Sequence, residues 1–245
     1  MAVKKPEFSF VIPAHNEQDN IGRLIATIIG LGRREGWKNY EILIVNDNSS
    51  DRTKKIVQAL QKRHKFISRL DRAKGNNGMG YSLIEGTKKA KGKVIIWTMG
   101  DLSDNINTYP KLLNAIEDGC DMVFGSRYMK GGSRGNLSPF KAFLSASFTR
   151  VTKLLYGIES HDITNAFRAF RKEVFENAKL ESGDFAISPE FAIKAQRMGY
   201  KLGEVPTTYT DRQAGKSSFK IMKMGRRYAT ILLKLLFYKP QHVKT

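Results

Sequence analysis

The chain has 245 residues, which fits one large domain or one domain with an elaborated C-terminal part, and its 41% hydrophobic content suffices for a sizeable core. Its single cysteine, Cys120, excludes an intrachain disulfide, and no neighbouring His or Cys would complete a zinc site. The net charge of +19 and the pI near 10.0 favour an anionic partner such as nucleic acid, a phosphorylated substrate or a membrane leaflet, although a lysine-rich solvated surface would give the same charge.

Three apolar segments in the first 105 residues each end in a polar segment that carries acidic residues. They are residues 8–12 followed by 13–17, residues 41–45 followed by 46–51, and residues 94–97 followed by 100–104. Short β-branched segments separated by helical patterns predict strands of a parallel sheet that is buried on both faces. Ligands of such sheets bind beyond the carboxyl ends of the strands, so the acidic segments should converge on one edge. Converging carboxylates repel one another unless a cation or a hydrogen-bonding ligand lies between them, so this edge is a predicted site.

The remaining elements follow the same alternation and then depart from it. Further strands are predicted over residues 66–70, 120–125, 166–171 and 202–209. Apolar residues at helical spacing predict helices over residues 21–29, from Ser50 or Asp51 to about 60, after Gly80, and over about 108–117, 140–156 and 186–198.

The second half of the chain contains two basic loops with glycines and a basic C-terminal segment. The loops cover residues 126–135 and 212–218, and residues 219–238 form an amphipathic segment. This tail is too short and too charged to span a bilayer, which needs about 20 apolar residues, but it suits a helix in the headgroup region. Alternatively, residues 219–238 form a helix that packs on its own domain or on a second subunit. No secretory signal precedes the first strand, which predicts a cytoplasmic location.

Asp47 and Asp51 flank a polar turn directly after the second strand. A carboxylate in this place can accept a hydrogen bond from the ring N–H of a base such as uracil or guanine. Asp51 could instead satisfy the unpaired N–H groups at the start of a helix. We expect ligand contact from Asp47 and capping from Asp51.

Asp101, Ser103 and Asp104 follow the third of the acid-ended strands. Two or three oxygen ligands together with a diphosphate would complete an octahedral shell for Mg²⁺ or Mn²⁺. Residues 75–80 have the glycine density of a phosphate loop but match neither the P-loop nor the dinucleotide fingerprint, so no phosphate is assigned to them. A nucleic-acid partner is not expected, because the basic residues cluster in two loops and the tail rather than on one helix.

Several motifs in order resemble family 2 glycosyltransferases of the GT-A fold. The nucleotide-sugar half matches at residues 10–17, 44–51 and 101–103. Residues 125–128, 162–170, 204–206 and 212–217 narrow the resemblance to the dolichol-phosphate mannosyltransferase and polyprenyl-phosphate glucosyltransferase branch. The resemblance implies a Rossmann-like mixed α/β sheet flanked by helices. It also implies inverting transfer of a hexose from a GDP- or UDP-sugar to a polyprenyl phosphate.

The resemblance assigns residues to roles and the chain to regions. The nucleotide-sugar half covers residues 1–125 and the acceptor half 126–218 of one GT-A domain, and 219–245 form the membrane-surface segment. Nucleoside contacts are implied for Pro13, Ala14, Glu17 and Asp47, with Asp101 holding the metal and the diphosphate. Acceptor phosphate contacts are implied for Arg127 and Arg134, and a closing loop over the phosphates for Arg212, Lys216 and Ser217. Asp162 or Glu190 would orient the acceptor or act as base, or each could pair with a nearby Arg or Lys.

One position departs from the family pattern. Met99 stands where the first acid of an acid-x-acid pair is expected, and a thioether is a poor ligand for hard cations. This departure would have one of three consequences. The metal affinity would be lower, Asp104 would replace the missing acid as a metal ligand, or the donor would differ from GDP-mannose. Two alternatives to a polyprenyl-phosphate glycosyltransferase remain. One is a transferase that acts on a glycan or other soluble acceptor, and the other is a non-catalytic membrane- or nucleic-acid-binding protein. The sequence makes no prediction of an oligomeric state.

Overall fold

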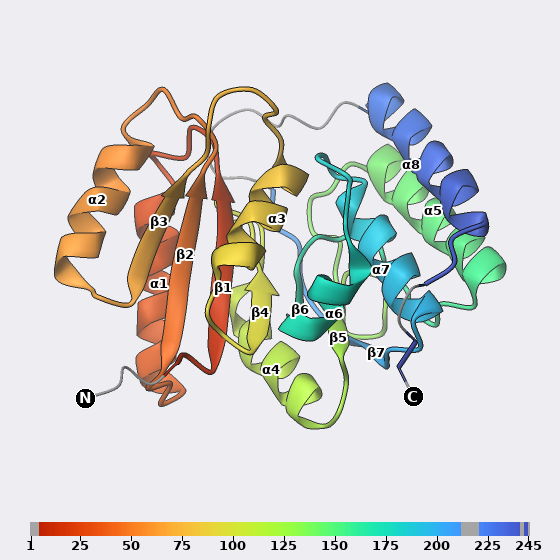
Figure 1. Cartoon of the computed structure of the whole chain (residues 1–245), viewed down its shortest axis with the longest axis horizontal. Coiled ribbons are helices and arrows are strands. Elements are labelled where there is room, and N and C mark those ends of the chain that lie inside the picture. Colours follow the sequence, from red (N-terminus) through yellow and green to blue (C-terminus); the bar gives the residue numbers. More distant parts are fainter. Residues whose placement is uncertain (1–4, 212–220, 241–242, 245) are drawn as a thin grey trace.

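The computed structural model describes residues 5–211, 221–240 and 243–244, which form a seven-stranded sheet with helices on both faces (Figure 1). Its strands are β1 (Phe8–Ala14), β2 (Tyr40–Asn46), β3 (Ile67–Asp71), β4 (Val94–Trp97), β5 (Met122–Ser126), β6 (Arg168–Arg171) and β7 (Leu202–Pro206). The strand order is β3-β2-β1-β4-β6-β5-β7, and β6 runs antiparallel to both of its neighbours. The predicted strands are therefore confirmed, and the sheet is mixed, as the resemblance implied.

The helices fill the intervals between the strands. They are α1 (Ile21–Arg34), α2 (Thr53–Arg63), α3 (Met79–Lys89), the 3₁₀ turn η1 (Ile106–Thr108), α4 (Tyr109–Glu117), α5 (Pro139–Tyr156), α6 (Lys172–Ala178), α7 (Ile187–Arg197) and α8 (Ile221–Leu236). The sequence analysis did not predict α6, because seven residues give too few turns for a helical period to stand out. None of the helices in the described part of the chain is long and apolar enough to cross a membrane.

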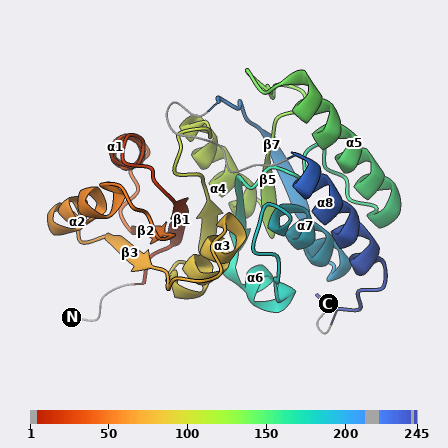
Figure 2. The ribbon, with the colours of Figure 1, turned by 90° about the horizontal axis from the view of Figure 1, so that it is seen from above.

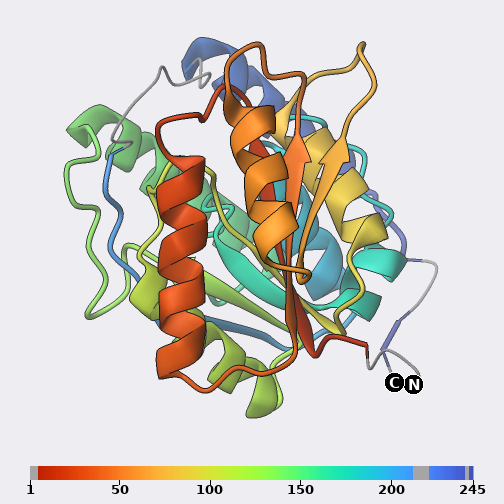
Figure 3. The same cartoon turned by 90° about the vertical axis from the view of Figure 1, so that its left-hand side faces the viewer.

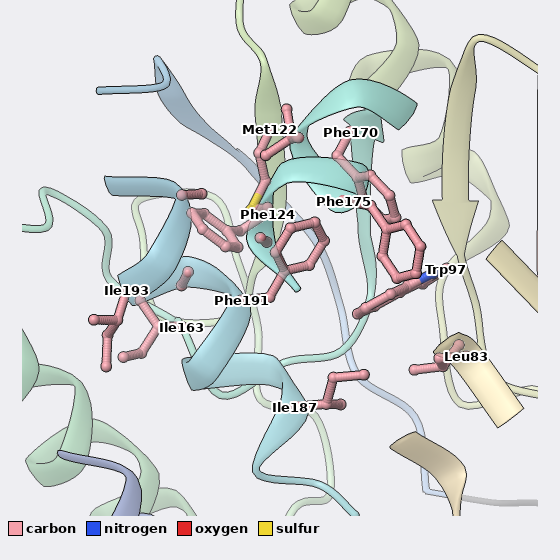
Figure 4. Close-up of a cluster of buried hydrophobic side chains, with 14 of the residues drawn as sticks. Leu83, Trp97, Met122, Phe124, Ile163, Phe170, Phe175, Ile187, Phe191 and Ile193 are labelled. Carbon is pink, nitrogen blue, oxygen red and sulfur yellow. The ribbon is translucent and has the colours of Figure 1, made fainter. Parts of the chain in front are cut away.

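Each face of the sheet has its own core, because side chains alternate across a strand. Ile42 and Ile44 of β2 point to the face that α1, α2 and α4 cover, and Figure 3 shows α1 and α2 side by side there. Leu43 and Val45 point to the opposite face, where α3, α6 and α7 pack. Trp97 lies in this second core (Figure 4), and its ring meets the edge of the Phe170 ring at 5.0 Å between centroids.

α5 and α8 lie side by side next to α7 (Figure 2), and both contribute to this second core, α5 through Tyr156 and α8 through Ile231 and Leu232. Ser138 caps the start of α5, because its hydroxyl accepts a hydrogen bond from the Lys141 N–H, and Gly157, with φ of 65°, caps its end. α8 buries Met224 and Leu235 against the domain. The chain therefore places two long helices together at one end of the sheet.

Candidate active site

A cavity of about 790 Å³ lies at the carboxyl ends of β1, β2 and β4. All three predicted acidic segments contribute to its lining. Among the predicted donor-site residues, the cavity is lined by Pro13, Ala14, Glu17, Asp47 and Asp101. The parallel pairing of β1 with β2 and β4 is the reason, because it brings the ends of these strands to the same edge.

Asp47 is fixed in this cavity by three donors, of which Asn48 Nδ2 is the most distant, at 3.4 Å from Oδ1. Its Oδ1 accepts from Nη1 of Arg72 at 2.6 Å, and its Oδ2 accepts from the backbone N–H of Gly78 at 2.8 Å. Arg72 is itself buried and pairs with Glu85 at 2.8 Å. The sequence analysis missed Arg72, because the pair spans 25 residues and no local pattern marks it. Asp47 is therefore held in one orientation before any ligand arrives.

The glycines after β3 are needed for close packing. A Cβ on Gly78 would lie 2.2 Å from the carbonyl oxygen of Gly183, and one on Gly80 would lie 2.3 Å from that of Ser182. Gly183 in turn packs directly on the ring of Tyr81. The loop at residues 181–184 also forms ion pairs with α8, from Asp184 to Arg227 at 2.9 Å and from Glu181 to Lys234.

Backbone strain gathers at the ends of the same three strands. Asn16, Asn48 and Leu102 follow β1, β2 and β4, and their φ angles are 55°, 57° and 61°. Such left-handed conformations cost free energy in residues other than glycine and persist where the surrounding structure holds them. The Asn16 side chain helps to hold its own backbone in place, because its Oδ1 accepts a hydrogen bond from the Ser50 N–H at 2.8 Å. This bond links the segment after β1 to the segment after β2.

Asp51 is not the N-cap residue of α2, which is Arg52, but its side chain satisfies an N–H group at the start of that helix, which is the task that we expected of it. Its Oδ1 accepts from the N–H of Thr53, the first residue of α2, at 2.9 Å. Its Oδ2 accepts from the N–H of Gln18 at 3.0 Å, and Asp51 does not line the cavity.

Asp101, Ser103 and Asp104 all line the cavity, together with Met99. Asp104 Oδ2 accepts from the Met99 N–H at 2.8 Å and from the Thr98 hydroxyl at 2.9 Å. Burial, and secondarily the charge of Asp101, raise the pKa of Asp104 to about 7. Two carboxylates and a hydroxyl are the oxygen donors that Mg²⁺ and Mn²⁺ prefer, and a cation would offset the repulsion between the carboxylates.

Asp101, Ser103 and Asp104 could hold a metal ion only if a bound substrate supplied further oxygen ligands. Within the described residues, no group of three or more His, Cys, Asp or Glu side chains is close enough to hold a metal ion. The predicted acids therefore share one cavity without forming a complete protein-only metal site. Oxygens of a bound diphosphate would have to supply the remaining ligands.

Arg127 lines the same cavity and is held by Asp162. Its Nε and Nη2 donate to the two carboxylate oxygens at 2.6 Å and 2.9 Å, and its backbone N–H donates at 3.1 Å. Burial alone would lower the pKa of Arg127, but the Asp162 carboxylate outweighs burial and raises it. Thr164 also accepts from Nη2 at 3.0 Å. The guanidinium is thus charged and fixed at the cavity wall.

The two predicted candidates for a base lie outside the cavity lining. Asp162 is fully buried, and Arg127 occupies both of its oxygens. Glu190 is buried behind α8, where it accepts from the backbone N–H groups of Glu181 at 3.0 Å and Ser182 at 2.8 Å, and pairs with Lys194 at 2.8 Å. Their catalytic role stays a prediction without support from this geometry.

The remaining predicted phosphate-binding residues are not brought into the cavity by the described structure. Arg134 is exposed and is not among the lining residues. Arg212, Lys216 and Ser217 lie outside the residues that the structure describes.

The far part of the cavity is apolar and was not predicted. α5 contributes Leu144, Phe148 and Val151, and α8 contributes Met224 and Leu232. Polar side chains that the sequence analysis also missed lie along the wall, namely Lys141, Ser145, Thr164, Tyr209 and Tyr228. The cavity therefore joins an acidic, polar part at the sheet edge to an apolar part between two helices.

The amino-acid sequence is similar to a glycosyltransferase family model and to two curated relatives. The family model described as glycosyl transferase family 2 matches residues 9–178. The chain is 34% identical to dolichol-phosphate mannosyltransferase of Pyrococcus furiosus over 86% of its own length, and it spans 59% of that relative. It is 27% identical to polyprenol monophosphomannose synthase of Mycolicibacterium smegmatis, over 89% of this chain and 86% of the relative.

Solved structures share the fold at low identity. One is glucosyl-3-phosphoglycerate synthase from Mycobacterium tuberculosis in complex with Mn²⁺, UDP and phosphoglyceric acid, with a TM-score of 0.66 and 16% identity over 97% of this chain and 81% of that one. Another is S. aureus TarS in complex with UDP-GlcNAc, with a TM-score of 0.65 and 15% identity over 94% of this chain and 66% of that one.

Proposed function

The chain belongs to glycosyl transferase family 2, and from this premise we propose that it transfers a hexose from a GDP- or UDP-sugar to a polyprenyl phosphate. We further propose that the transfer inverts the anomeric carbon and takes place at the cytoplasmic face of a membrane, to which the protein binds peripherally.

The observation that carries this proposal is the two-part cavity. A nucleotide sugar is polar throughout and fits the part with Asp47 and Asp101, whereas the apolar part between α5 and α8 fits a hydrocarbon chain. A soluble acceptor would have no use for an apolar wall that contains Phe148 and Leu232. The names of the two curated relatives point to the same acceptor class.

On the donor side, each residue has a proposed task. Asp47 would accept from the ring N–H of the base, in the orientation that Arg72 and Gly78 impose on it. Pro13, Ala14 and Glu17 would complete the nucleoside pocket, and Asp101, Ser103 and Asp104 would hold Mg²⁺ or Mn²⁺. When bound, the cation would neutralise the charge that builds on the departing nucleoside diphosphate.

On the acceptor side, Arg127 would bind the lipid phosphate. Asp162 then acts as a positioning residue, because it binds the Nε–Nη2 edge of the guanidinium and leaves Nη1 as the group that no described residue occupies. Arg134, Arg212, Lys216 and Ser217 keep their proposed role around the phosphates. The phosphate is already an anion near neutral pH, so the attack needs positioning more than a general base.

The outer surface of α5 and α8 supports the proposed membrane contact. Leu154 and Phe143 of α5 are 86% and 64% exposed, and Leu233 of α8 and Phe237 just after it are 66% and 86% exposed. Large apolar side chains that solvent surrounds are typical of surfaces that bind a partner or a bilayer. With the net charge of +19, this surface suits an anionic leaflet.

The test is a panel of radiolabelled GDP- and UDP-sugars with a short polyprenyl phosphate, with and without Mn²⁺. We expect one nucleotide sugar to give a lipid-linked product and to need the divalent ion. Phosphoglyceric acid serves as the soluble acceptor in the same panel, because the structural neighbour from M. tuberculosis was crystallised with it. Product only with the soluble acceptor, or with none, would refute the proposal.

A further inference from the structure

Two tyrosines line the cavity, and their hydroxyl groups differ. The Tyr209 hydroxyl donates to Asp211 at 3.2 Å. The Tyr228 hydroxyl has no hydrogen-bond partner among the described residues, and it is not among the buried polar atoms that are sealed from solvent. The Tyr228 hydroxyl therefore opens into the cavity.

Tyr228 stands at the boundary between the two parts of the cavity. Its ring packs on Phe148 of α5, with 4.7 Å between the ring centroids, and so belongs to the apolar part. Besides burial, four charged side chains act on the pKa of its hydroxyl, namely the cations Arg127 and Arg168 and the anions Asp184 and Asp162. A tyrosine suits such a boundary because it joins an apolar ring to one polar atom.

The hydroxyl is a donor under ordinary conditions. Burial raises the pKa of Tyr228 well above its usual range, and the positive charge of Arg127 offsets this only in part. A ligand that enters the cavity removes the water around the hydroxyl, and a donor left without a partner then costs free energy. The ligand that fits best carries an acceptor oxygen at this point.

Arg127 offers a second donor nearby. Its Nε and Nη2 are used by Asp162, Ser145 and Thr164, and its Nη1 has no partner within the described part of the chain. Arg127 and Tyr228 thus contribute two donors without a described partner to the lining of one cavity, which also includes the apolar side chains of α5 and α8.

We propose that Tyr228 is a specificity-determining residue for the acceptor: its hydroxyl binds an oxygen of the lipid phosphate beside Arg127, and its ring contacts the first carbons of the chain. This inference rests on the proposed function. It adds a residue of α8 to the site and assigns it to the acceptor rather than to the donor.

The test compares wild type with Tyr228→Phe, which keeps the ring and removes the hydroxyl. We expect kcat/KM for a short polyprenyl phosphate to fall about tenfold, mainly through KM, because a hydrogen bond to a charged group is lost. The KM of the sugar nucleotide, the calorimetric affinity for GDP and UDP, and the melting temperature should not change. Tyr238→Phe is the matched control, since Tyr238 follows α8 but lies outside this cavity, and it should behave as wild type.

Two results would overturn the inference while the proposed function stands. One is a Tyr228→Phe enzyme with wild-type kcat/KM for the lipid phosphate. The other is a loss of nucleotide affinity with unchanged acceptor kinetics, which would assign the hydroxyl to the donor diphosphate. If wild type transfers sugar to no polyprenyl phosphate, the proposed function fails and the inference fails with it.

Discussion

The two parts of the cavity are built in different ways. At the sheet edge, Asp47 has a fixed orientation, and strained residues follow three of the strands. Between α5 and α8 most of the large side chains in the wall are apolar, although Lys141 and Ser145 also line it, and Arg127 is the strongly anchored charge. A nucleotide has many polar atoms that a rigid frame must match, whereas an isoprenoid chain needs only apolar surface and one fixed point for its phosphate. Substitutions in the two parts should therefore have separable effects.

The largest expected effect is at the sheet edge. Asp101→Asn should reduce kcat about 100-fold or more, because it weakens stabilisation of the leaving group. The measurement is sugar transfer over a range of Mn²⁺ concentrations, alongside Mn²⁺ binding in the presence of the nucleoside diphosphate. Asp118→Asn, an exposed carboxylate that does not line the cavity, is the control. Full activity of Asp101→Asn would contradict a joint role for the sheet-edge acids.

Asp162→Asn tests the anchored charge of the acceptor part. It leaves Arg127 buried without its counter-ion, which should lower the free energy of unfolding by about 3 kcal/mol and weaken acceptor kinetics. Urea unfolding and acceptor kcat/KM measure the two effects, while nucleotide affinity should be retained. A variant with weaker nucleotide binding but normal acceptor kinetics would show that the two parts are not separable in this way.

Arg72→Met tests how much the fixed orientation of Asp47 contributes. Loss of the 2.6 Å contact leaves Asp47 with one fewer donor, and the affinity for the nucleotide should fall about tenfold. Isothermal titration calorimetry with GDP and UDP measures it, and the exposed Lys74, changed to Met, is the control. Equal affinities for both variants would mean that Gly78 and Asn48 hold Asp47 well enough without Arg72.

Leu154→Glu should have the smallest effect and leave the chemistry intact. It places a charge on the exposed face of α5, so partition onto anionic vesicles should fall about tenfold, while transfer to a short, water-soluble polyprenyl phosphate stays unchanged. Vesicle sedimentation measures the partition. Gln58→Glu on the exposed face of α2 makes the same charge change. If both variants lose binding equally, net charge rather than the α5 surface controls attachment.

The sheet edge was more predictable from the sequence than the space between the helices. Asp47 and Asp101 follow strands that local patterns reveal, and the parallel pairing then brings them together. The contact between Arg127 and Asp162 spans 35 residues, and Tyr228 reaches the cavity only because α8 folds back onto α5. No local pattern encodes such distances. The resemblance implied a mixed sheet, but the residues alone assigned no direction to β6, since pairing direction depends on the path of the connecting chain.

The glycine contacts between the loop at 181–184 and the start of α3 have an evolutionary consequence. A methyl group on Gly183 would have to displace Tyr81, and side chains at Gly78 or Gly80 would collide with the backbone of the loop. The same loop is ion-paired to α8. A substitution at any of these three glycines would therefore disturb both α3 and α8, so we expect such substitutions to be tolerated less often than changes on the exposed faces of α5 and α8.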